Sequence, residues 1–383
     1  MKKLKIAINL LRFSPNVNIG GNYTYSYNII NGLISHTNEN GNIYYLLVTK
    51  ENKKMFDFEH PNIKFIFGES KNNIISQLIY ENYFIRKILK NNKFDLFYSP
   101  NFLLPFFKLK LPTVATIHDI NFMHFSQGKL KDIYKHIIYR KTLKNATGIT
   151  TVSNFTKEDV CKHFGNFEYK IKVVYNGCNY LNELKNNIDK DAFKKAYNIN
   201  KEYILAISHY KHKNAQLAIK AFSYAKPNLK KDFKLIITGA KGQLKQNLID
   251  IARSHAVLND VIFIDFVKNE YMKSMYAGAS LFLFPSIFEG FGLPVIEAMS
   301  MGCPVIASDR ASIPEVVGNA GILLDINSPE VWGRNIVKIL NDSNFKESLI
   351  SKGYEQAKKF DWNYSAKILL EVFAESYRNF YEN

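Results

Sequence analysis

Residues 285–308 read PSIFEGFGLPVIEAMSMGCPVIAS, a run of apolar and small residues that holds two acids, Glu289 and Glu297. An unpaired charge in such surroundings costs on the order of several kcal/mol, so each carboxylate needs a partner. On either side, Ala279–Pro285 and Pro304–Ser308 have the composition of short buried strands. The stretch therefore predicts two parallel strands joined through a helix, which is the unit from which α/β sheets are built.

A helix from about Leu293 to Met301 is predicted between these strands. Pro294 suits its first position, where the missing N–H costs nothing, and Gly302 suits the residue after its end. Glu297 is then expected in the first turn and Glu289 in the loop before it, both beyond the end of a parallel strand. Open α/β sheets bind ligands there, so both acids are candidate ligand contacts. The alternative is that either acid only caps the helix or pairs with a lysine.

Short apolar runs alternate with amphipathic ones along the whole chain, which predicts parallel sheets with helices on both faces. In the first half we expect strands over Lys5–Leu10, Ile43–Thr49, Leu96–Ser99, Thr113–Ile117, Gly148–Val152 and Lys172–Tyr175, and helices over Asn22–Ile34, Ile74–Lys90, Lys129–Lys144 and Thr156–Phe164. In the second half we expect strands over Tyr203–Ile207, Lys234–Gly239, Val261–Ile264, Leu281–Phe284, Val305–Ala307 and Ile322–Leu324, and helices over 214–225, 243–256 and the tail from about Pro329.

The polar stretch 181–191 (LNELKNNIDKD) separates the two series of strands and predicts a connection between domains. A chain of 383 residues is also long for a single core. We therefore expect an α/β protein of two doubly wound, Rossmann-like domains that face a cleft, over residues 1–180 and 181–360.

The formal net charge of +17 is concentrated in the first half of the chain. Residues 1–180 hold 25 Lys+Arg against 12 Asp+Glu (+13), while the remaining 203 residues hold 26 against 22 (+4). An acidic partner of the first half is therefore expected, either anionic lipid, an acidic substrate or nucleic acid. A general bias toward lysine and asparagine is the alternative, although bias alone does not explain the asymmetry.

Cysteine usage and hydropathy indicate the compartment. Cys161, Cys178 and Cys303 are widely spaced and form no CxxC pair, which argues against a disulfide framework and against a zinc site. No apolar run approaches the roughly 20 residues of a membrane span. The basic start MKKLKIAINL lacks a small-residue cleavage site, so KIAINL is predicted to be a strand and not part of a signal peptide. We expect a cytoplasmic protein.

Two segments that follow predicted strands suit the binding of phosphate. Gly20 and Gly21 open a helix after the first strand and its loop, and backbone N–H groups at such a turn suit an oxyanion. Residues 209–214 (HYKHKN) follow the strand YILAIS and begin a helix, so their cations could meet a diphosphate. In each case the alternative is an ordinary loop, flexible in the first and solvated and basic in the second.

His118 and a pair of aspartates are candidates for other chemistry. His118 follows the strand TVATI, at the strand end where this fold places functional groups, and a histidine packed in the core is the alternative. Asp189-Lys190-Asp191 matches Asp-x-Asp, a metal–nucleotide signature. It lies in the polar linker, however, where Asp191 is expected to cap the next helix. We therefore expect no metal ion.

Taken together, these segments closely resemble retaining glycosyltransferase family 4, of the group 1 glycosyltransferases with the GT-B architecture. The segment 281–316 carries the family's Glu-x7-Glu motif as Glu289 and Glu297. Further matches occur in family order and span nearly the whole chain, namely Gly20-Gly21, TIHDI (116–120), TVSNFTKEDV (151–160), VVYNGCN (173–179), HKNAQLAIKAF (212–222), LIITGAKG (235–242) and FDWNYSA (360–366).

The resemblance implies transfer of a sugar from a nucleotide-sugar, with retention at the anomeric carbon and usually without a metal or other cofactor. By family analogy, Glu297 accepts hydrogen bonds from the ribose and Glu289 approaches hydroxyls of the donor sugar. The other donor-binding residues implied are Gly20, Gly21, His209, Lys213, Gly290, Phe291, Gly292 and Leu293. Lys213, the glycine amides and a helix N-terminus would absorb the charge that builds on the leaving diphosphate.

Two departures from the family pattern affect these assignments. Ser208 stands where the family usually has glycine, and His209 where it often has arginine, so a phosphate contact is expected more from Lys213 than from His209. No nucleophile for a double displacement is evident, which favours front-face attack with the leaving phosphate taking the acceptor's proton. The catalytic residues expected are Lys213, Glu289 and His118, the last holding the donor sugar and not acting as a base.

The sequence resembles most closely the bacterial mannosyl- and rhamnosyltransferases of surface polysaccharide and lipopolysaccharide synthesis. GDP-mannose is the favoured donor, with UDP- and dTDP-sugars as alternatives, and a growing, lipid-linked glycan is the expected acceptor. The apolar run 101–112 (NFLLPFFKLKLP) and the basic helices 74–93 and 129–144 could contact an anionic bilayer at the inner face of the cytoplasmic membrane. Core packing with a solvated outer face is the alternative. The family also implies a C-terminal helix, about 361–383, that packs back on the N-terminal domain.

Other functions are a sugar-nucleotide epimerase or a glycogen-type phosphorylase of the same architecture and, from another class, a basic nucleic-acid-binding protein. A phosphorylase would need a lysine for pyridoxal phosphate in a much longer chain, and an epimerase would match TIHDI and Glu-x7-Glu poorly. A nucleic-acid-binding protein requires basic and aromatic residues clustered on one face. We expect no nucleic-acid partner.

Overall fold

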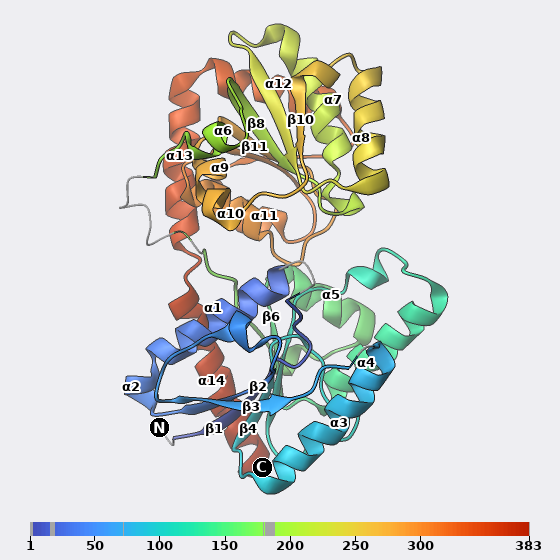
Figure 1. Cartoon of the computed structure of the whole chain (residues 1–383), viewed down its shortest axis with the longest axis vertical. Coiled ribbons are helices and arrows are strands. Elements are labelled where there is room, and N and C mark those ends of the chain that lie inside the picture. Colours follow the sequence, from blue (N-terminus) through green and yellow to red (C-terminus); the bar gives the residue numbers. More distant parts are fainter. Residues whose placement is uncertain (1–2, 16–19, 72, 179, 181–187, 383) are drawn as a thin grey trace. The chain divides into compact units, whose positions relative to one another are not determined.

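The computed structural model describes residues 3–15, 20–71, 73–178, 180 and 188–382. The chain divides into two compact units. Unit 1 holds residues 1–177 and 362–383, and unit 2 holds residues 178–361. Each unit contains one parallel sheet with helices packed on it (Figure 1).

Unit 1 is built on a parallel sheet of seven strands in the order β3-β2-β1-β4-β5-β6-β7. Its strands are β1 (Lys5–Asn9), β2 (Ile43–Thr49), β3 (Ile63–Gly68), β4 (Leu96–Ser99), β5 (Thr113–Ile117), β6 (Gly148–Thr151) and β7 (Ile171–Val173). Every residue of the central strands β4 and β5 is buried, as expected for strands covered on both faces. Strand β3 was not predicted, because its edge position exposes Lys64 and Phe67 and interrupts the apolar run.

The helices of unit 1 are α1 (Gly21–Ser35), α2 (Thr37–Asn40), α3 (Ile74–Asn91), α4 (Lys129–Asn145), α5 (Asn154–Phe164) and α14 (Trp362–Tyr381), with the 3-10 turns η1 (Lys53–Phe56), η2 (Asn121–Met123) and η3 (Glu168–Lys170). Helix α14 packs on α1, although the two are far apart in sequence. Glycine permits the close approach: a Cβ at Gly32 would lie 2.8 Å from that of Ala366, and one at Gly177 would lie 2.5 Å from Trp362. Helix α14 is therefore part of unit 1.

Unit 2 has a parallel sheet of six strands in the order β10-β9-β8-β11-β12-β13. Its strands are β8 (Glu202–Ile207), β9 (Phe233–Thr238), β10 (Val261–Ile264), β11 (Leu281–Phe284), β12 (Val305–Ser308) and β13 (Ile322–Leu324). Its helices are α6 (Ala192–Ala196), α7 (Ala215–Ala225), α8 (Gly242–Ser254), α9 (Met272–Ala277), α10 (Leu293–Ser300), α11 (Ile313–Val317), α12 (Pro329–Asn341) and α13 (Ser343–Lys358), with the 3-10 turns η5 (Lys211–Lys213), η6 (Lys226–Asn228), η7 (Leu258–Asp260) and η8 (Asn269–Tyr271).

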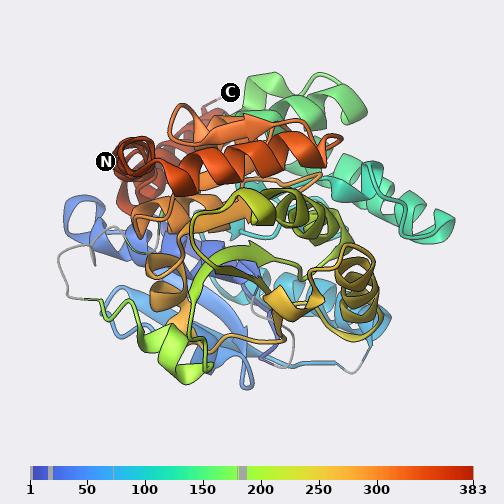
Figure 2. The ribbon, with the colours of Figure 1, turned by 90° about the horizontal axis from the view of Figure 1, so that it is seen from above.

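Helices cover both faces of the unit 2 sheet. Buried side chains of α7, α8 and α12 form one core with the strands, while α10 and α13 pack together on the other face (Figures 1 and 2). This arrangement leaves the carboxyl ends of the strands and the loops that follow them as the place for polar side chains. None of the helices in the described ranges is both long and apolar enough to span a bilayer.

Candidate functional site

The carboxyl ends of β8 and β11 bring two loops of unit 2 together. These strands pair in parallel, with Leu281 opposite Ile204, so both end at the same edge of the sheet. Strand β8 also pairs with β9, and β11 with β12, which makes this pair the point where the strand order reverses. Open α/β sheets bind ligands at such a point. The loops that follow, 208–214 and 285–292, contain most of the donor contacts implied by the sequence.

Lys213 and Glu289 form an ion pair across these two loops. The Nζ atom of Lys213 lies 2.7 Å from Oε1 of Glu289, and each side chain is only 12% exposed. The Ser286 hydroxyl donates to the same carboxylate oxygen at 2.6 Å, and the Lys213 ammonium lies 5.1 Å from the ring centroid of Phe284. Lys213, expected at the diphosphate, and Glu289, expected at the donor sugar, are therefore in contact. The ammonium of Lys213 compensates the charge of the Glu289 carboxylate.

Further hydrogen bonds hold the backbone of the Glu289 loop. The Ile287 N–H donates to the His212 carbonyl at 2.7 Å and so ties the two loops together. From the other side, the Ser312 hydroxyl lies 2.9 Å from the carbonyl oxygen of Glu289 and 2.8 Å from that of Phe291. Sequence reasoning did not single out this serine, although it lies within the segment that carries the family motif. Its contacts fix the backbone that presents the acid.

Glu297 lies deeper in the fold than the sequence predicted. Helix α10 begins at Leu293, after Gly292 with its left-handed φ of 112°, and Pro294 lies in its first turn. Glu297 is therefore in the second turn, not the first, and is only 8% exposed. Its Oε2 accepts a hydrogen bond from the Tyr276 hydroxyl at 3.2 Å. Burial, and then the nearby Glu297 carboxylate, hold the pKa of Tyr276 well above its ordinary value, so the phenol stays protonated as a donor.

The ring of His209 lies against Gly239, at the end of β9. Gly239 has a φ of +85°, and a Cβ there would lie 2.6 Å from the imidazole, so the close approach requires glycine. Burial lowers the pKa of His209, and the charges of Lys213 and Lys241 lower it further. A neutral imidazole offers hydrogen bonds but little positive charge to a diphosphate. Lys213 is the stronger candidate for that charge.

Unit 1 holds the other residues implied by the sequence, among them His118, directly after β5. Its Nε2 lies 2.7 Å from the carbonyl oxygen of Pro100, which can only accept, so Nε2 carries the proton. Burial lowers the pKa of His118 to about 4, with the Pro100 carbonyl acting in the opposite direction. The ring is therefore neutral near pH 7, with Nδ1 as an acceptor. An edge-to-face contact with Tyr25, at 4.8 Å between centroids, restrains the ring.

Gly20 and Gly21 lie at the amino end of α1. Gly20 takes the N-cap position with an extended backbone, and its carbonyl accepts from the N–H groups of Tyr23 and Thr24 at 3.0 and 3.2 Å. Both glycines are exposed, and residues 16–19 before them lie outside the described residues. The positive end of this 15-residue helix dipole can therefore be approached by an anion.

The Asp-x-Asp segment does not cap its helix as predicted. Asp191 precedes α6 but makes no side-chain cap hydrogen bond, because its backbone is already helical (φ −91°, ψ −9°). Instead, Oδ1 of Asp189 accepts from the Asp191 N–H at 2.9 Å. The two acids lie 3.3 and 3.7 Å from Lys195 and Lys194 respectively. The segment is a local turn whose acids have lysine partners.

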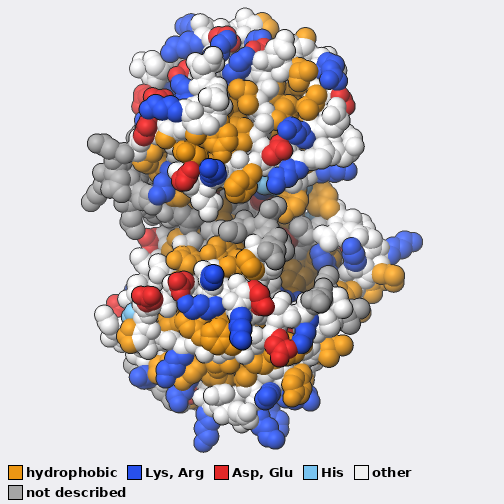
Figure 3. Space-filling view, in the orientation of Figure 1, with side chains coloured by type: hydrophobic (Ala, Val, Ile, Leu, Met, Phe, Trp, Pro, Cys, Tyr) orange, Lys and Arg blue, Asp and Glu red, His pale blue; other side chains and the backbone are white. Residues whose placement is uncertain are grey.

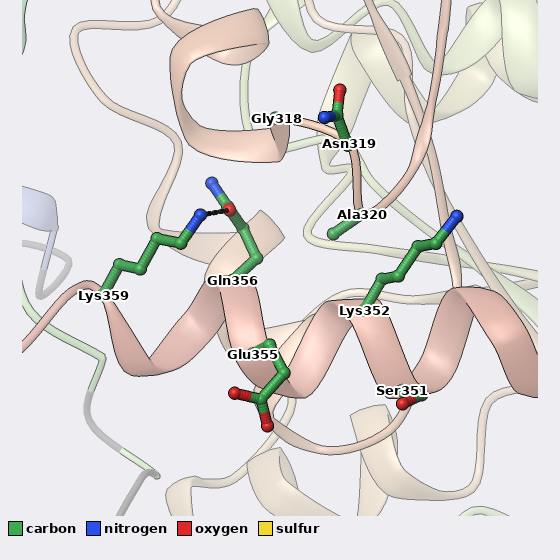
Figure 4. Close-up of a pocket in the computed structure, with 8 residues that line it drawn as sticks. All are labelled: Gly318, Asn319, Ala320, Ser351, Lys352, Glu355, Gln356 and Lys359. Carbon is green, nitrogen blue, oxygen red and sulfur yellow. Dashed lines mark hydrogen bonds between the residues drawn. The ribbon is translucent and has the colours of Figure 1, made fainter.

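A separate hollow in unit 2 lies beside α13. It has a volume of about 430 Å³ and is lined by Gly318, Asn319, Ala320, Ser351, Lys352, Glu355, Gln356 and Lys359 (Figure 4). The side-chain amide of Gln356 is engaged on both sides: it donates to the Val316 carbonyl at 3.0 Å and accepts from Lys359 at 2.9 Å. None of the donor-binding residues implied by the sequence lines this hollow, so it is not the candidate donor site.

Two family models match the chain. Residues 187–356 match the model described as "Glycosyl transferases group 1", and residues 38–180 match "Glycosyltransferase Family 4". The chain belongs to the group 1 glycosyltransferases. This glycosyltransferase is 28% identical to O-antigen chain mannosyltransferase B of Escherichia coli over 278 residues, which are 72% of each chain. It is 25% identical to an uncharacterized glycosyltransferase of Methanocaldococcus jannaschii over 303 residues, 75% of this chain and 76% of the other.

Solved structures show the same fold. A glycosyltransferase from Rickettsia africae has a TM-score of 0.74 at 18% identity, covering 99% of this chain and 100% of its own. Anabaena HepE in complex with UDP-glucose has a TM-score of 0.75 at 17% identity, covering 97% of this chain and 99% of its own. The prediction of a GT-B glycosyltransferase with two doubly wound, Rossmann-like domains is confirmed.

Proposed function

We propose that this glycosyltransferase moves a mannosyl residue from GDP-mannose to a growing, lipid-linked surface glycan, with retention at the anomeric carbon. The names of two relatives support the choice of sugar. One is the Escherichia coli mannosyltransferase, and the other is O-antigen chain mannosyltransferase RfbU of Salmonella typhimurium, 28% identical over 225 residues that are 58% of this chain and 60% of the other. UDP- and dTDP-sugars are the alternative donors.

The Lys213–Glu289 pair is the observation that carries this proposal. A nucleotide-sugar offers a complementary group to each partner, a diphosphate to the ammonium and sugar hydroxyls to the carboxylate. Hydrogen bonds of this charge-assisted kind contribute on the order of 1.5–3 kcal/mol each. Because both side chains are only 12% exposed, little water competes for them. The donor would therefore replace one internal ion pair with two separate contacts.

In the proposed step, the bond between the anomeric carbon and the diphosphate oxygen breaks while the acceptor oxygen bonds to the same face of that carbon. The acceptor's proton passes to the leaving phosphate oxygen. In unit 2, Lys213 stabilises the charge that grows on the diphosphate. The neutral His118, with Nδ1 as an acceptor, holds a hydroxyl of the donor sugar. No metal ion is proposed, because Lys213 supplies compensating charge.

Unit 1 is proposed to dock at the inner face of an anionic cytoplasmic membrane, where a lipid-linked acceptor is held. Helix α4 supports this docking. It exposes four large apolar side chains at the i, i+3, i+4, i+7 spacing of one helix face, namely Leu130 (85%), Ile133 (58%), Tyr134 (42%) and Ile137 (57%). Core packing, the alternative in the sequence analysis, does not explain an apolar stripe that faces solvent.

The same face of α4 becomes basic toward its carboxyl end. A hollow of about 280 Å³ is lined there by His136, Ile137, Arg140, Lys141, Lys144 and Asn145. Hydrophobic and basic side chains lie together at the outer end of α4 (Figure 3). A helix that combines apolar and basic side chains suits the interface of an anionic bilayer, where each nearby Lys or Arg contributes about 1 kcal/mol.

The name of a further relative supports a lipid-linked acceptor. An α-N-acetylgalactosaminyltransferase of Campylobacter jejuni, named for a diphospho-undecaprenol glycan, is 27% identical over 208 residues, 53% of each chain. The acceptor proposed here belongs to the same chemical class, a sugar on an acidic polyprenyl lipid. Such a substrate would place its phosphates at the depth of the lipid headgroups, beside basic side chains.

The proposal is tested by titrating the purified protein with GDP, UDP and dTDP, followed by transfer assays with the matching sugar-nucleotides and a polyprenyl-linked acceptor. We expect GDP to bind most tightly and the product to keep the anomeric configuration of the donor. Tighter binding of UDP or dTDP, with transfer from that nucleotide, would establish the alternative donor. Binding of no nucleotide, together with salt-sensitive binding of DNA or RNA, would overturn the assignment.

A further inference from the structure

Three side chains of unit 1 that have no part in the proposed transfer form a compact cluster. His124 directly follows η2, and Asp159 and His163 lie one turn apart on α5, so these two share a face of that helix. One ligand atom from each of the three residues lies within 4.8 Å of the others. We infer that His124, Asp159 and His163 form a site for a divalent transition-metal ion, with zinc as the expected ion.

The distances in the cluster are near those of a tetrahedral ligand set. Nε2 of His124 lies 2.8 Å from Oδ2 of Asp159, and Nδ1 of His163 lies 3.2 Å from Oδ1 and 3.0 Å from the backbone carbonyl oxygen of Asp159. Zinc binds histidine nitrogen and carboxylate oxygen at about 2.0–2.2 Å, so two of its ligands are separated by roughly 3.3 Å. Metal binding would displace the proton that Nδ1 of His163 directs at these oxygens, and small rotations of the side chains would then bring all three ligand atoms around one ion.

The buried charge of Asp159 favours a cation at this place. Its side chain is only 6% exposed, and within the described ranges its ion pairs are with these two imidazoles alone. A buried carboxylate requires compensation, which hydrogen bonds and positively charged groups provide. A divalent ion held by two neutral imidazoles and the carboxylate would compensate the charge directly.

The donor set also indicates the class of metal. Imidazole is a good ligand for zinc, copper, nickel and iron, whereas magnesium and calcium prefer oxygen ligands throughout. The side chains of His124 and His163 are 32% and 22% exposed, which leaves a path for the ion and room for water as a fourth ligand. Bound there, the ion would fasten the segment after β5, which begins with His118, to helix α5.

The test uses tag-free, full-length protein that has been stripped with a chelating resin. Zinc chloride is titrated by calorimetry, thermal unfolding is followed with and without zinc, and Co²⁺ is used as a probe because a tetrahedral site gives it a visible spectrum. We expect one zinc ion per chain and a rise in Tm of about 5 °C at a hundredfold excess over the Kd. Magnesium should produce neither effect.

His163→Asn should abolish the zinc-dependent rise in Tm, and His163→Cys should restore zinc binding while adding a thiolate-to-cobalt absorption band. His255→Asn, which alters a histidine of unit 2, is the matched control and should behave as the natural chain does. The measured quantity is the rise in Tm that zinc causes in each protein. A lower Tm of the metal-free variant therefore does not obscure the result. Absence of zinc binding below about 100 μM, or a full zinc increment in His163→Asn, would overturn the inference.

Discussion

Lys213 and Glu289 form an ion pair between the loops that follow β8 and β11, with 2.7 Å from Nζ to Oε1 and 12% of each side chain exposed. Their contact depends on the parallel pairing of these two strands, which sets both loops at one edge of the sheet. Because each partner restrains the other, the cation and the acid have defined positions before a donor binds. Preorganised charges of this kind lose little free energy to rearrangement during a reaction.

Lys213→Ala should lower kcat/KM by roughly 10²–10³ while the far-ultraviolet circular dichroism stays unchanged, since it removes a preorganised charge contact to the diphosphate. Lys211→Ala is the matched control, because this exposed lysine belongs to the same 3-10 turn. The measurement is steady-state transfer by both variants. Near-normal turnover of Lys213→Ala would contradict the role given to this residue.

Glu297→Ala should also reduce transfer by roughly 10²–10³, with a comparable loss in nucleotide affinity, because its carboxylate is proposed to hold the ribose. Glu297→Gln separates charge from shape, since the amide oxygen can still accept from the Tyr276 hydroxyl. Calorimetric titration with nucleotide and a transfer assay are the measurements. Glu347→Ala, at an exposed position of α13, is the control. If all three variants bind nucleotide alike, the ribose assignment is wrong.

Transfer should continue in excess EDTA at a rate close to that of the untreated protein. The reason is that Lys213 is proposed to supply the charge compensation that a metal provides elsewhere. The assay compares initial rates in EDTA, Mg²⁺ and Mn²⁺. A complete loss in EDTA that Mg²⁺ or Mn²⁺ restores would mean that the donor is held through a metal.

His118 should make stability depend on pH between about 6.5 and about 4. Its pKa is lowered to about 4 in the folded protein, against an ordinary value near 6.5, so within this window the unfolded chain binds a proton that the folded chain does not. The free energy of unfolding should therefore fall as the pH is lowered through the window and level off below it. Urea unfolding at pH 7 and pH 5 measures the effect.

His118→Asn isolates this contribution, because burial also lowers the pKa of His209 and His212. The variant should lose less stability between pH 7 and pH 5 than the natural chain does. An equal loss in both proteins would show that His118 titrates normally.

The α4 face should govern binding to anionic membranes. Ile133→Ser combined with Ile137→Ser removes two exposed apolar side chains, 58% and 57% exposed, and should weaken binding to phosphatidylglycerol-rich liposomes without changing Tm. Binding by the natural chain should also fall as salt rises, because the basic contribution is screened over about 8 Å. Co-sedimentation is the measurement. Equal binding to neutral and anionic liposomes, or none at low salt, would refute the docking and favour a soluble acceptor.

Most strands were predictable because buried parallel strands have unbroken apolar runs. Strand β3 was missed since an edge strand exposes residues such as Lys64 and Phe67 and loses that signal. The turn of Glu297 was also wrong by one: α10 begins at Leu293, as predicted, but Glu297 is its fifth residue and so lies beyond the first turn.

Contacts between distant residues were least accessible to sequence reasoning. Glu289 was predicted to contact a ligand, with a lysine only as the alternative partner, and its pairing with Lys213 could not be foreseen because that contact depends on which strands pair. The cluster of His124, Asp159 and His163 was likewise missed, since its members come from two separate elements and match no short metal-binding motif. The same reason applies to Ser312, whose hydroxyl reaches back to the loop of Glu289.

Helix α14 has a consequence for how the chain assembles on the ribosome. Domains generally fold as units while they emerge, beginning with the N-terminal one. Here residues 1–177 emerge first but lack the 20-residue helix that covers α1, whereas every residue of unit 2 has emerged once Asp361 has left the exit tunnel. Unit 2 can therefore complete its fold first. Residues 1–177 can complete the fold of unit 1 only after α14 has emerged.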